Sequence, residues 1–259
     1  MPRAHRHFVA GQVWHVTHRC HERAFLLKFA HDRRTYLHWL FQAKKRYGLC
    51  ILDYMVTCNH VHLVVRDDGS DVIARSMQLA AGRTAQEFNR RKTRRGAFWE
   101  DRYHATAIET GDHLHRCLVY VALNMVRAGV VQHPREWSHG GYNEIQRPPQ
   151  RYSTIDVPCL AALCGFDTVE QFQSTRRTWV ESAINRCDHH RDASWTEAVA
   201  VGTPSFIAGV QRELGSRGRH RHVTETEAGH VLRQPVSPYD ADFGGKNGVV
   251  SLKSDLFFD

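Results

Sequence analysis

The stretch that decides the fold runs from Tyr54 to Val65 and reads YMVTCNHVHLVV. β-Branched and apolar residues dominate it, and a short polar break at residues 57–59 divides it into two segments that favour strands. Because side chains alternate between the two faces of a strand, His60 and His62 share one face. Two imidazoles side by side on a rigid strand could supply two ligands of a metal site, although packed or hydrogen-bonded histidines fit the same pattern.

The chain contains 19 histidines, so a His-x-His triplet can arise by chance. One other triplet falls in a predicted helix, where residues two apart do not face each other, and another falls in a basic stretch that predicts a solvated loop. A Cys-Asp-His-His run has no second half at zinc-ligand spacing. Only the first pair combines the spacing with a strand whose other face suits a core. The weaker groupings are His113 with His115, His220 with His222, and residues 187–190.

Hydrophobic periodicity on either side of this stretch predicts alternating strands and helices. Their order, β-α-β-β-α-β, is that of a ferredoxin-like (RRM-like) split sandwich of the α+β class, in which an antiparallel sheet keeps one open face. The predicted strands are residues 13–20, 50–56, 60–66 and 104–109, and the predicted helices are residues 32–47 and 71–91.

A third helix is predicted from residue 111 to residue 128, between an Asp that favours its start and a Gly that ends it. Most of its residues follow core spacing. One stripe differs, because Arg116, Tyr120, Asn124 and Arg127 recur at intervals that place them on one face. A phenol and a carboxamide one turn apart, flanked by two guanidinium groups, are unusual on a helix that otherwise faces a core.

The rest of the chain predicts a helical extension. The pair Pro148-Pro149 indicates a linker, so we expect one domain over residues 1–150 and a second region over residues 151–259. Helices are predicted at 168–184 and at 194–214, the second broken near Gly202, and the polar, glycine-rich residues after Arg221 predict an extended tail.

Composition describes an ordinary globular protein, with 42% hydrophobic and 24% charged residues among 259. No apolar run is long enough for a bilayer, and the N-terminal residues do not have the pattern of a signal peptide. Seven dispersed cysteines without a Cys-x-x-Cys motif indicate free thiols in a reducing compartment.

The formal net charge is +8, and the sequence pI is about 9.3, which favours a polyanionic partner. The basic residues also cluster: residues 90–95 contain five cations in six positions, residues 44–46 are all basic, and arginines alternate at 217, 219 and 221. We therefore expect a nucleic acid as the partner.

Three short segments occur in a fixed order along the chain: NHVHL at 59–63, FWEDRY at 98–103 and YVALNMVRAG at 120–129. This ordered set resembles the REP-associated tyrosine transposases, single-tyrosine HUH (His-hydrophobe-His) endonucleases related to small insertion-sequence transposases. The resemblance covers roughly residues 5–145. The chain departs from it at Met125, where the family usually has proline.

The resemblance implies that Tyr120 is the nucleophile, attacking a single-stranded DNA phosphodiester to give a 5′-phosphotyrosine and a free 3′-OH. It implies that His60, His62 and Asn124 hold a divalent ion, Mg²⁺ or Mn²⁺. It also implies a bacterial cytoplasmic, nucleoid-associated transposase that cuts at hairpin-forming repetitive extragenic palindromes, as a monomer or a homodimer. The geometric consequence is that the two histidines and the asparagine must converge.

Other interpretations remain open. Tyr120 could simply pack in the core, Tyr103 is the second candidate nucleophile, and Asn124 could cap the backbone. The aromatic pair at 98–99 suits a core better than base stacking. A domesticated, non-catalytic hairpin-binding protein is the alternative function, and replication initiation or conjugative nicking is a further one. The predicted DNA contacts are Arg3, Arg6, Arg90, Arg91, Lys92, Arg94, Arg95, Arg102, Arg116 and Arg127, of which the last two are also expected beside the phenol.

Overall fold

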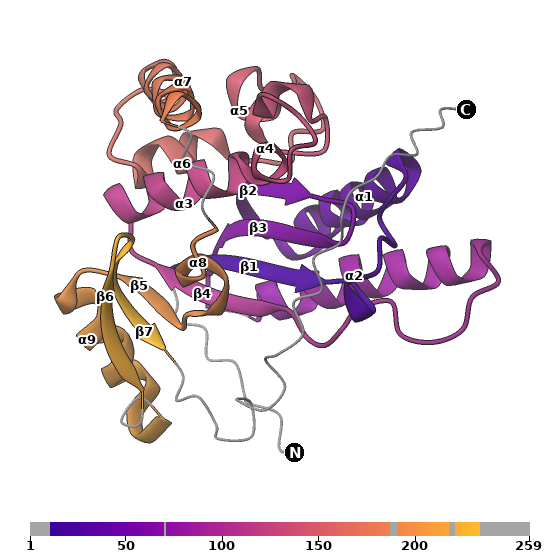
Figure 1. Cartoon of the computed structure of the whole chain (residues 1–259), viewed down its shortest axis with the longest axis horizontal. Helices are drawn as coiled ribbons and strands as arrows, with labels where there is room; N and C mark the ends of the chain where they lie inside the picture. Colours follow the sequence, from indigo (N-terminus) through magenta and orange to yellow (C-terminus); the bar gives the residue numbers. More distant parts are fainter. Residues whose placement is uncertain (1–10, 70, 187–190, 218–220, 234–259) are drawn as a thin grey trace.

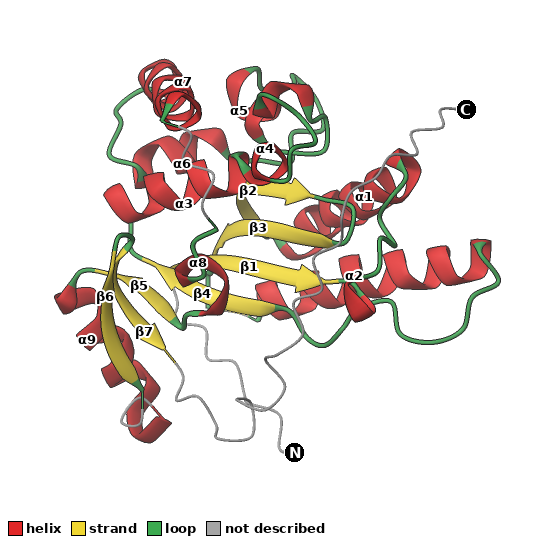
Figure 2. Cartoon of the chain, in the orientation of Figure 1, coloured by secondary structure: helices red, strands yellow, loops and turns green. Residues whose placement is uncertain are grey.

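A seven-stranded sheet with the order β2-β3-β1-β4-β5-β7-β6 forms the centre of the computed structural model (Figures 1 and 2). Neighbouring strands are antiparallel except β4 and β5, which are parallel. The structure describes residues 11–69, 71–186, 191–217 and 221–233.

The first four strands and two helices have the predicted β-α-β-β-α-β order, which confirms the split sandwich. The register pairs Thr17 on β1 with His62 on β3. The alternating β-branched stretches of β1 and β3 thus form neighbouring internal strands, with β2 at the edge of the sheet. The elements are β1 (Val13–Arg19), α1 (Ala30–Tyr47), β2 (Cys50–Val56), β3 (His60–Arg66), α2 (Val72–Arg91) and β4 (His104–Ile108).

The two faces of this sheet have different coverings. On one face, His18 stacks on Trp99, whose indole N–H donates to the Ala81 carbonyl of α2. On the other face, His62 contacts Asn124, close to α3 (Asp112–Ala122), while α8 (Ser194–Glu197) lies over β1 and β4 (Figure 1). The strand alternation therefore directs the histidine pair toward α3 and α8.

The third predicted helix is interrupted. It ends at Ala122 and restarts as α4 (Asn124–Arg127), so the prediction of one continuous helix was wrong. Leu123 has φ −79° and ψ 4°, a bridge conformation that opens the helix by one residue. The Arg127 N–H donates to the Leu123 carbonyl, which starts the new turn. Asn124 thus lies at the beginning of a helix rather than inside one.

The C-terminal region is only partly helical. The helix predicted over 194–214 is broken near Gly202, as expected, but a strand lies at the break. The predicted tail after Arg221 is wrong over residues 222–233, and its remainder, 234–259, lies outside the described residues. Residues Ala200–Gly202 form β5, which pairs with β4, because this buried apolar triplet continues the sheet. A hairpin of β6 (His222–Thr226) and β7 (Gly229–Arg233) follows.

The remaining helices of the described residues are α5 (Tyr142–Gln146), α6 (Val157–Leu163), α7 (Val169–Asn185) and α9 (Pro204–Leu214). Single 3₁₀ turns lie at His21–Arg23, Pro134–Glu136 and Gly215–Arg217.

One core joins the two regions that the sequence separated at residue 150. Val64, Phe172 and Ile207 belong to the same cluster of buried side chains. Arg176 on α7 is fully buried, and its Nη2 lies 2.7 Å from an oxygen of Asp53 on β2. The division into domains stays a prediction, and the C-terminal part contributes both strands and core residues to the same sheet.

No helix among the described residues is long and apolar enough to span a membrane. The cysteines in this part of the chain are free thiols, as predicted: Cys20, Cys50, Cys58, Cys117, Cys159 and Cys164.

Candidate active site

A cleft of about 700 Å³ lies between β3, the α3–α4 junction and the segment around α8. The structure places four of the predicted site residues in its lining: His60 and His62 from β3, Tyr120 from α3, and Asn124 from the start of α4. The histidine, tyrosine and asparagine motifs, which are far apart in the sequence, therefore share one cavity.

His60 is held by its neighbour in the loop before β3. Its Nδ1 lies 2.7 Å from Oδ1 of Asn59, and Nδ2 of Asn59 donates to the Arg23 carbonyl at 3.1 Å. That second bond orients the carboxamide, because a carbonyl only accepts, so Oδ1 is left to accept the Nδ1 proton of His60. The Nε2 lone pair of a neutral His60 then remains available in the cleft.

His62 is buried and makes contacts through both ring nitrogens. Its Nε2 lies 2.9 Å from Nδ2 of Asn124, and its ring centroid lies 4.8 Å from that of His60. Burial lowers the pKa of His60 to about 4 and lowers the pKa of His62 well below its usual value. Both rings are therefore neutral near pH 7, the form that binds metal ions.

The separation of His62 and Asn124, beside His60, suits two ligands of one divalent ion. Turning the Asn124 carboxamide over would put its oxygen where the nitrogen now lies, 2.9 Å from Nε2 of His62. Two ligand atoms about 2.1 Å from an octahedral ion, at right angles to each other, are about 3.0 Å apart. Two imidazole nitrogens and one amide oxygen would leave positions open for phosphate oxygens.

Tyr120 is largely buried, and its ring meets that of His62 edge-on with 6.1 Å between the centroids. The guanidinium of Arg127 lies 4.1 Å from the centre of the phenol ring and donates to the Tyr120 carbonyl at 2.7 Å. Burial raises the pKa of Tyr120, while the charges of Arg127 and Arg191 lower it. The expectation of a cation beside the phenol is met by Arg127, and Arg191 was not predicted.

The predicted DNA contacts lie in different parts of the molecule. Arg102 and Arg127 line the cleft. Arg116 instead donates to the Glu227 carbonyl at 2.8 Å and lines a second cleft of about 630 Å³, which Tyr120 also borders. Arg3 and Arg6 lie outside the described residues.

The basic cluster at residues 90–95 does not contribute to the described lining of the candidate cleft. Its members contact their own surroundings, because Arg91 pairs with Asp32 and Arg94 donates to the Ala97 carbonyl at 2.9 Å. The cluster lies at and just beyond the end of α2. Because α2 covers the face opposite the histidine pair, a DNA strand contacting both places would have to pass around the sheet.

The aromatic residues of the second motif are structural. Phe98 is buried, and Trp99 packs on His18 with 4.1 Å between ring centroids. Tyr103 is also buried and lies edge-on to the same histidine, and it is not among the described residues that line the cleft. The second candidate nucleophile is thus placed apart from the histidine pair.

Sequence reasoning missed the residues that reach the cleft from β1, β4 and the C-terminal region. His15 on β1 contacts His62, and Trp195 on α8 lies against Tyr120. The alternation of residues 13–20 showed that His15 faces one side of a strand, but only the strand pairing places it behind His62. The residues that line the cleft itself and were not predicted include Thr17, His18, Arg19, Arg23, His104, Arg191, Thr196 and Glu197.

The fold and this cleft define a class, that of α+β proteins with a histidine pair on a central strand facing a tyrosine-bearing helix. Residues 9–124 match the sequence model of the family described as "Transposase IS200 like", and the match ends at the candidate ligand Asn124. This part of the chain is therefore similar to the IS200-like transposases, which supports the resemblance to tyrosine transposases.

Solved structures with partial likeness were also found. One is described as a REP-associated tyrosine transposase bound to a REP hairpin, with 18% identity, a TM-score of 0.48, and 59% of this chain and 90% of that chain covered. Another, designated a transposase from Deinococcus radiodurans R1, has 16% identity, a TM-score of 0.34, and 44% and 90% covered. A search of the curated proteins found no match.

Proposed function

We propose that the protein is a metal-dependent endonuclease and strand transferase for single-stranded DNA that acts through a 5′-phosphotyrosine on Tyr120. The observation that carries this proposal is the shared cleft, in which the phenol, two neutral imidazoles and a carboxamide meet. A tyrosine that only packed in a core would not need this neighbourhood.

Each side chain has a role in the proposed reaction. Bound at His60, His62 and Asn124, a Mg²⁺ or Mn²⁺ ion would neutralise charge on the non-bridging oxygens of the scissile phosphate. Tyr120 would form the new ester bond to phosphorus while the 3′ oxygen leaves, and the bond energy kept in that ester permits later rejoining. Arg127 offsets the effect of burial on the phenol by stabilising its deprotonated form.

The shape and charge of the cleft suit a single strand. It is open, its volume is about 700 Å³, and arginines enter it from β1, from the loop before β4 and from the C-terminal region. Those cations bind phosphates without reading bases. The choice of hairpin-forming palindromes rests on the resemblance of the motifs.

A labelled single-stranded hairpin, incubated with Mn²⁺ and separated on a denaturing gel, tests the proposal. The wild-type protein should give a covalent protein–DNA band. This band should not form when a chelator is present or in the variant Tyr120→Phe. The matched control, Tyr103→Phe, should still form it. A wild-type protein that binds the hairpin without cleaving it would favour the non-catalytic alternative, and cleavage by Tyr120→Phe would exclude the proposed nucleophile.

A further inference from the structure

A third histidine lies directly behind the metal-facing pair. His15 on β1 is fully buried, and its Nε2 lies 2.9 Å from Nδ1 of His62. Its Nδ1 lies 2.7 Å from the backbone carbonyl oxygen of Trp195. The planes of the His15 and His62 rings are only 13° apart and their centroids are 5.1 Å apart, which suits an N–H···N bond in the plane of the rings. A chain of hydrogen bonds therefore runs from the C-terminal region, through β1, to the candidate metal ligand.

The direction of this chain follows from its first partner. A carbonyl oxygen can only accept, so Nδ1 of His15 carries the proton. A ring buried away from water keeps a single proton, which leaves Nε2 of His15 as an acceptor. Nδ1 of His62 must then be the donor, and Nε2 of His62 keeps its lone pair.

We infer that His15 is a positioning residue which, together with the Trp195 carbonyl, fixes His62 in the tautomer whose Nε2 is available to a metal ion. The claim that a metal ion binds Nε2 of His62 rests on the proposed function, whereas the tautomer of His62 does not. Asn59 has the corresponding role for His60. The C-terminal region, which the sequence presented as an appendage, thus supplies the end of the hydrogen-bond chain.

The tautomer can be measured without metal or DNA. A long-range ¹H–¹⁵N correlation spectrum of the chelator-treated, ¹⁵N-histidine-labelled protein distinguishes protonated from bare ring nitrogens. We expect both His15 and His62 to carry the proton on Nδ1, with the His62 signals assigned by their loss in His62→Gln. A proton on Nε2 of either ring would overturn the inference.

Metal affinity gives a second readout. His15→Leu should weaken Mn²⁺ binding, followed by electron paramagnetic resonance, by about 10- to 100-fold, the range found when partners behind metal-bound histidines are removed. His15→Gln should recover part of the affinity, because its amide oxygen can accept near the former Nε2. The control Thr106→Val removes another bond to the same segment, from Thr106 Oγ1 to the Ala198 carbonyl at 2.8 Å, and should leave affinity unchanged.

The outcomes separate the two claims. If the wild-type protein binds no Mn²⁺ while both rings show the expected tautomer, the proposed function fails and the assignment of His15 stands. If folded His15→Leu and His15→Gln both bind Mn²⁺ as the wild type does, the positioning role of His15 is wrong.

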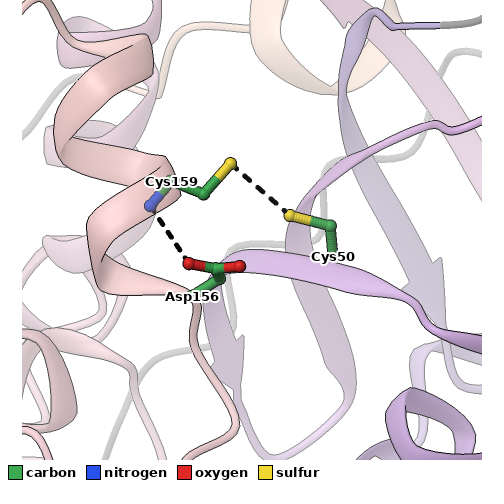
Figure 3. A group of neighbouring side chains, drawn as sticks. All are labelled: Cys50, Asp156 and Cys159. Carbon is green, nitrogen blue, oxygen red and sulfur yellow. Dashed lines mark hydrogen bonds between the residues drawn. The ribbon is translucent and has the colours of Figure 1, made fainter.

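A second group of potential metal ligands lies at the start of α6, and none of its residues lines the cleft. Cys50 begins β2, and Asp156 and Cys159 flank the first turn of α6, with the two thiols turned toward each other (Figure 3). Their sulfur atoms are 3.7 Å apart. Asp156 accepts the Cys159 N–H at 3.0 Å, and one potential ligand atom from each residue lies within 4.8 Å of the others.

These separations fit a thiophilic ion. Two sulfur atoms about 2.3 Å from a zinc ion at the tetrahedral angle are about 3.8 Å apart, whereas a disulfide needs about 2.05 Å. All three side chains are partly exposed, so an ion could enter from solvent. Only one carboxylate oxygen of Asp156 is used in capping α6.

We propose that Cys50, Asp156 and Cys159 form a Zn²⁺ site with three protein ligands and one position for water. Such a site would fasten the start of α6 to β2, where the Asp156 N–H already donates to the Ile51 carbonyl at 2.8 Å. Burial and the adjacent Cys159 raise the pKa of the Cys50 thiol to about 12. Binding should therefore release protons and strengthen with pH.

Titration of the reduced protein with Co²⁺, a spectroscopic substitute for Zn²⁺, tests this site. We expect one equivalent to give a thiolate-to-cobalt charge-transfer band that Zn²⁺ abolishes and that is lost in both Cys50→Ser and Cys159→Ser. Cys58→Ser, a half-buried thiol beside Arg33, is the control and should keep the band.

The absorption band also separates this site from the catalytic cleft, whose candidate ligands include no thiol. Asp156→Asn keeps an oxygen that can cap α6 but loses the charge, so it should retain the fold and bind Co²⁺ more weakly. Absence of a thiolate band in the wild type, or its persistence in Cys50→Ser and Cys159→Ser, would overturn the proposal.

Discussion

Replacing Arg176 with methionine should destabilise the protein strongly, although Arg176 lies on α7, outside the cleft. Its guanidinium is fully buried and pairs with Asp53, which is 1% exposed, at 2.7 Å. Arg176→Met would leave a buried carboxylate without its counter-charge. Among the described residues, Asp53 would keep the Tyr54 N–H as a hydrogen-bond donor at 2.8 Å, which compensates part of the loss.

The magnitude follows from that unpaired charge. Breaking a buried ion pair by removing one partner costs about 3–5 kcal/mol. Against a total stability of about 5–15 kcal/mol, this is a large fraction. At roughly 2–4 °C per kcal/mol for a chain near this size, the melting temperature should fall by on the order of 10 °C. Adding Asp53→Asn to Arg176→Met should recover much of the loss, because no charge is then stranded.

Urea unfolding followed by circular dichroism measures the effect. The control is Arg177→Met, the next residue on α7, which is exposed, bonds Gln146 at 3.2 Å, and should change stability by less than about 0.5 kcal/mol. Equal midpoints for the two single variants would refute the reasoning. Truncation near residue 150 would likewise remove the partner of Asp53, so it would disturb the fold as well as any hairpin contact.

Three further predictions concern the site. Burial lowers the pKa of His15 to about 4, from about 6.5 in the unfolded chain. The stability of the metal-free protein should therefore be constant above pH 6.5 and fall toward pH 4. Protonation of this ring should account for up to about 3 kcal/mol of that fall. In urea unfolding at several pH values, His15→Gln should show a shallower fall, and an identical pH dependence would contradict the assignment. Met125→Pro should lower the stability by less than the roughly 3 kcal/mol expected for a proline inside a helix, since the helix is already interrupted at Leu123. Thermal melts compare this variant with one that has a proline in the middle of α3. Equal losses of stability in the two variants would show that the reasoning is wrong. Arg127→Gln should shift the pH–rate profile of cleavage to higher pH, because removing this cation raises the pKa of Tyr120 further, and an unchanged profile would exclude that role.

The sandwich could be predicted because its signals are local. The strands at 50–56 and 60–66 were located to the residue, since alternating β-branched runs are bounded there by a helix-ending glycine and a polar break. The hairpin of β6 and β7 was missed although HVTET and GHVLR alternate, because the polar composition around them indicated a tail. Strand β5 is too short for any periodicity to mark it.

The site could be predicted only in its motif residues. The spacing of Tyr120 and Asn124 survives the interruption at Leu123, so both enter the cleft. His15 carries no local signal, because its role depends on lying behind His62 and below Trp195. Such contacts between residues far apart in the sequence follow from strand pairing, which one sequence does not specify.

The most direct test of the central claim is to locate the covalent bond to DNA. After reaction with a single-stranded hairpin and Mn²⁺, nuclease and trypsin digestion should leave a nucleotide mass on the peptide CLVYVALNMVR, residues 117–127, whose only tyrosine is Tyr120. The account predicts the adduct there and its loss under chelation. An adduct on the peptide that begins at Tyr103, or cleavage with no protein–DNA adduct at all, would contradict it.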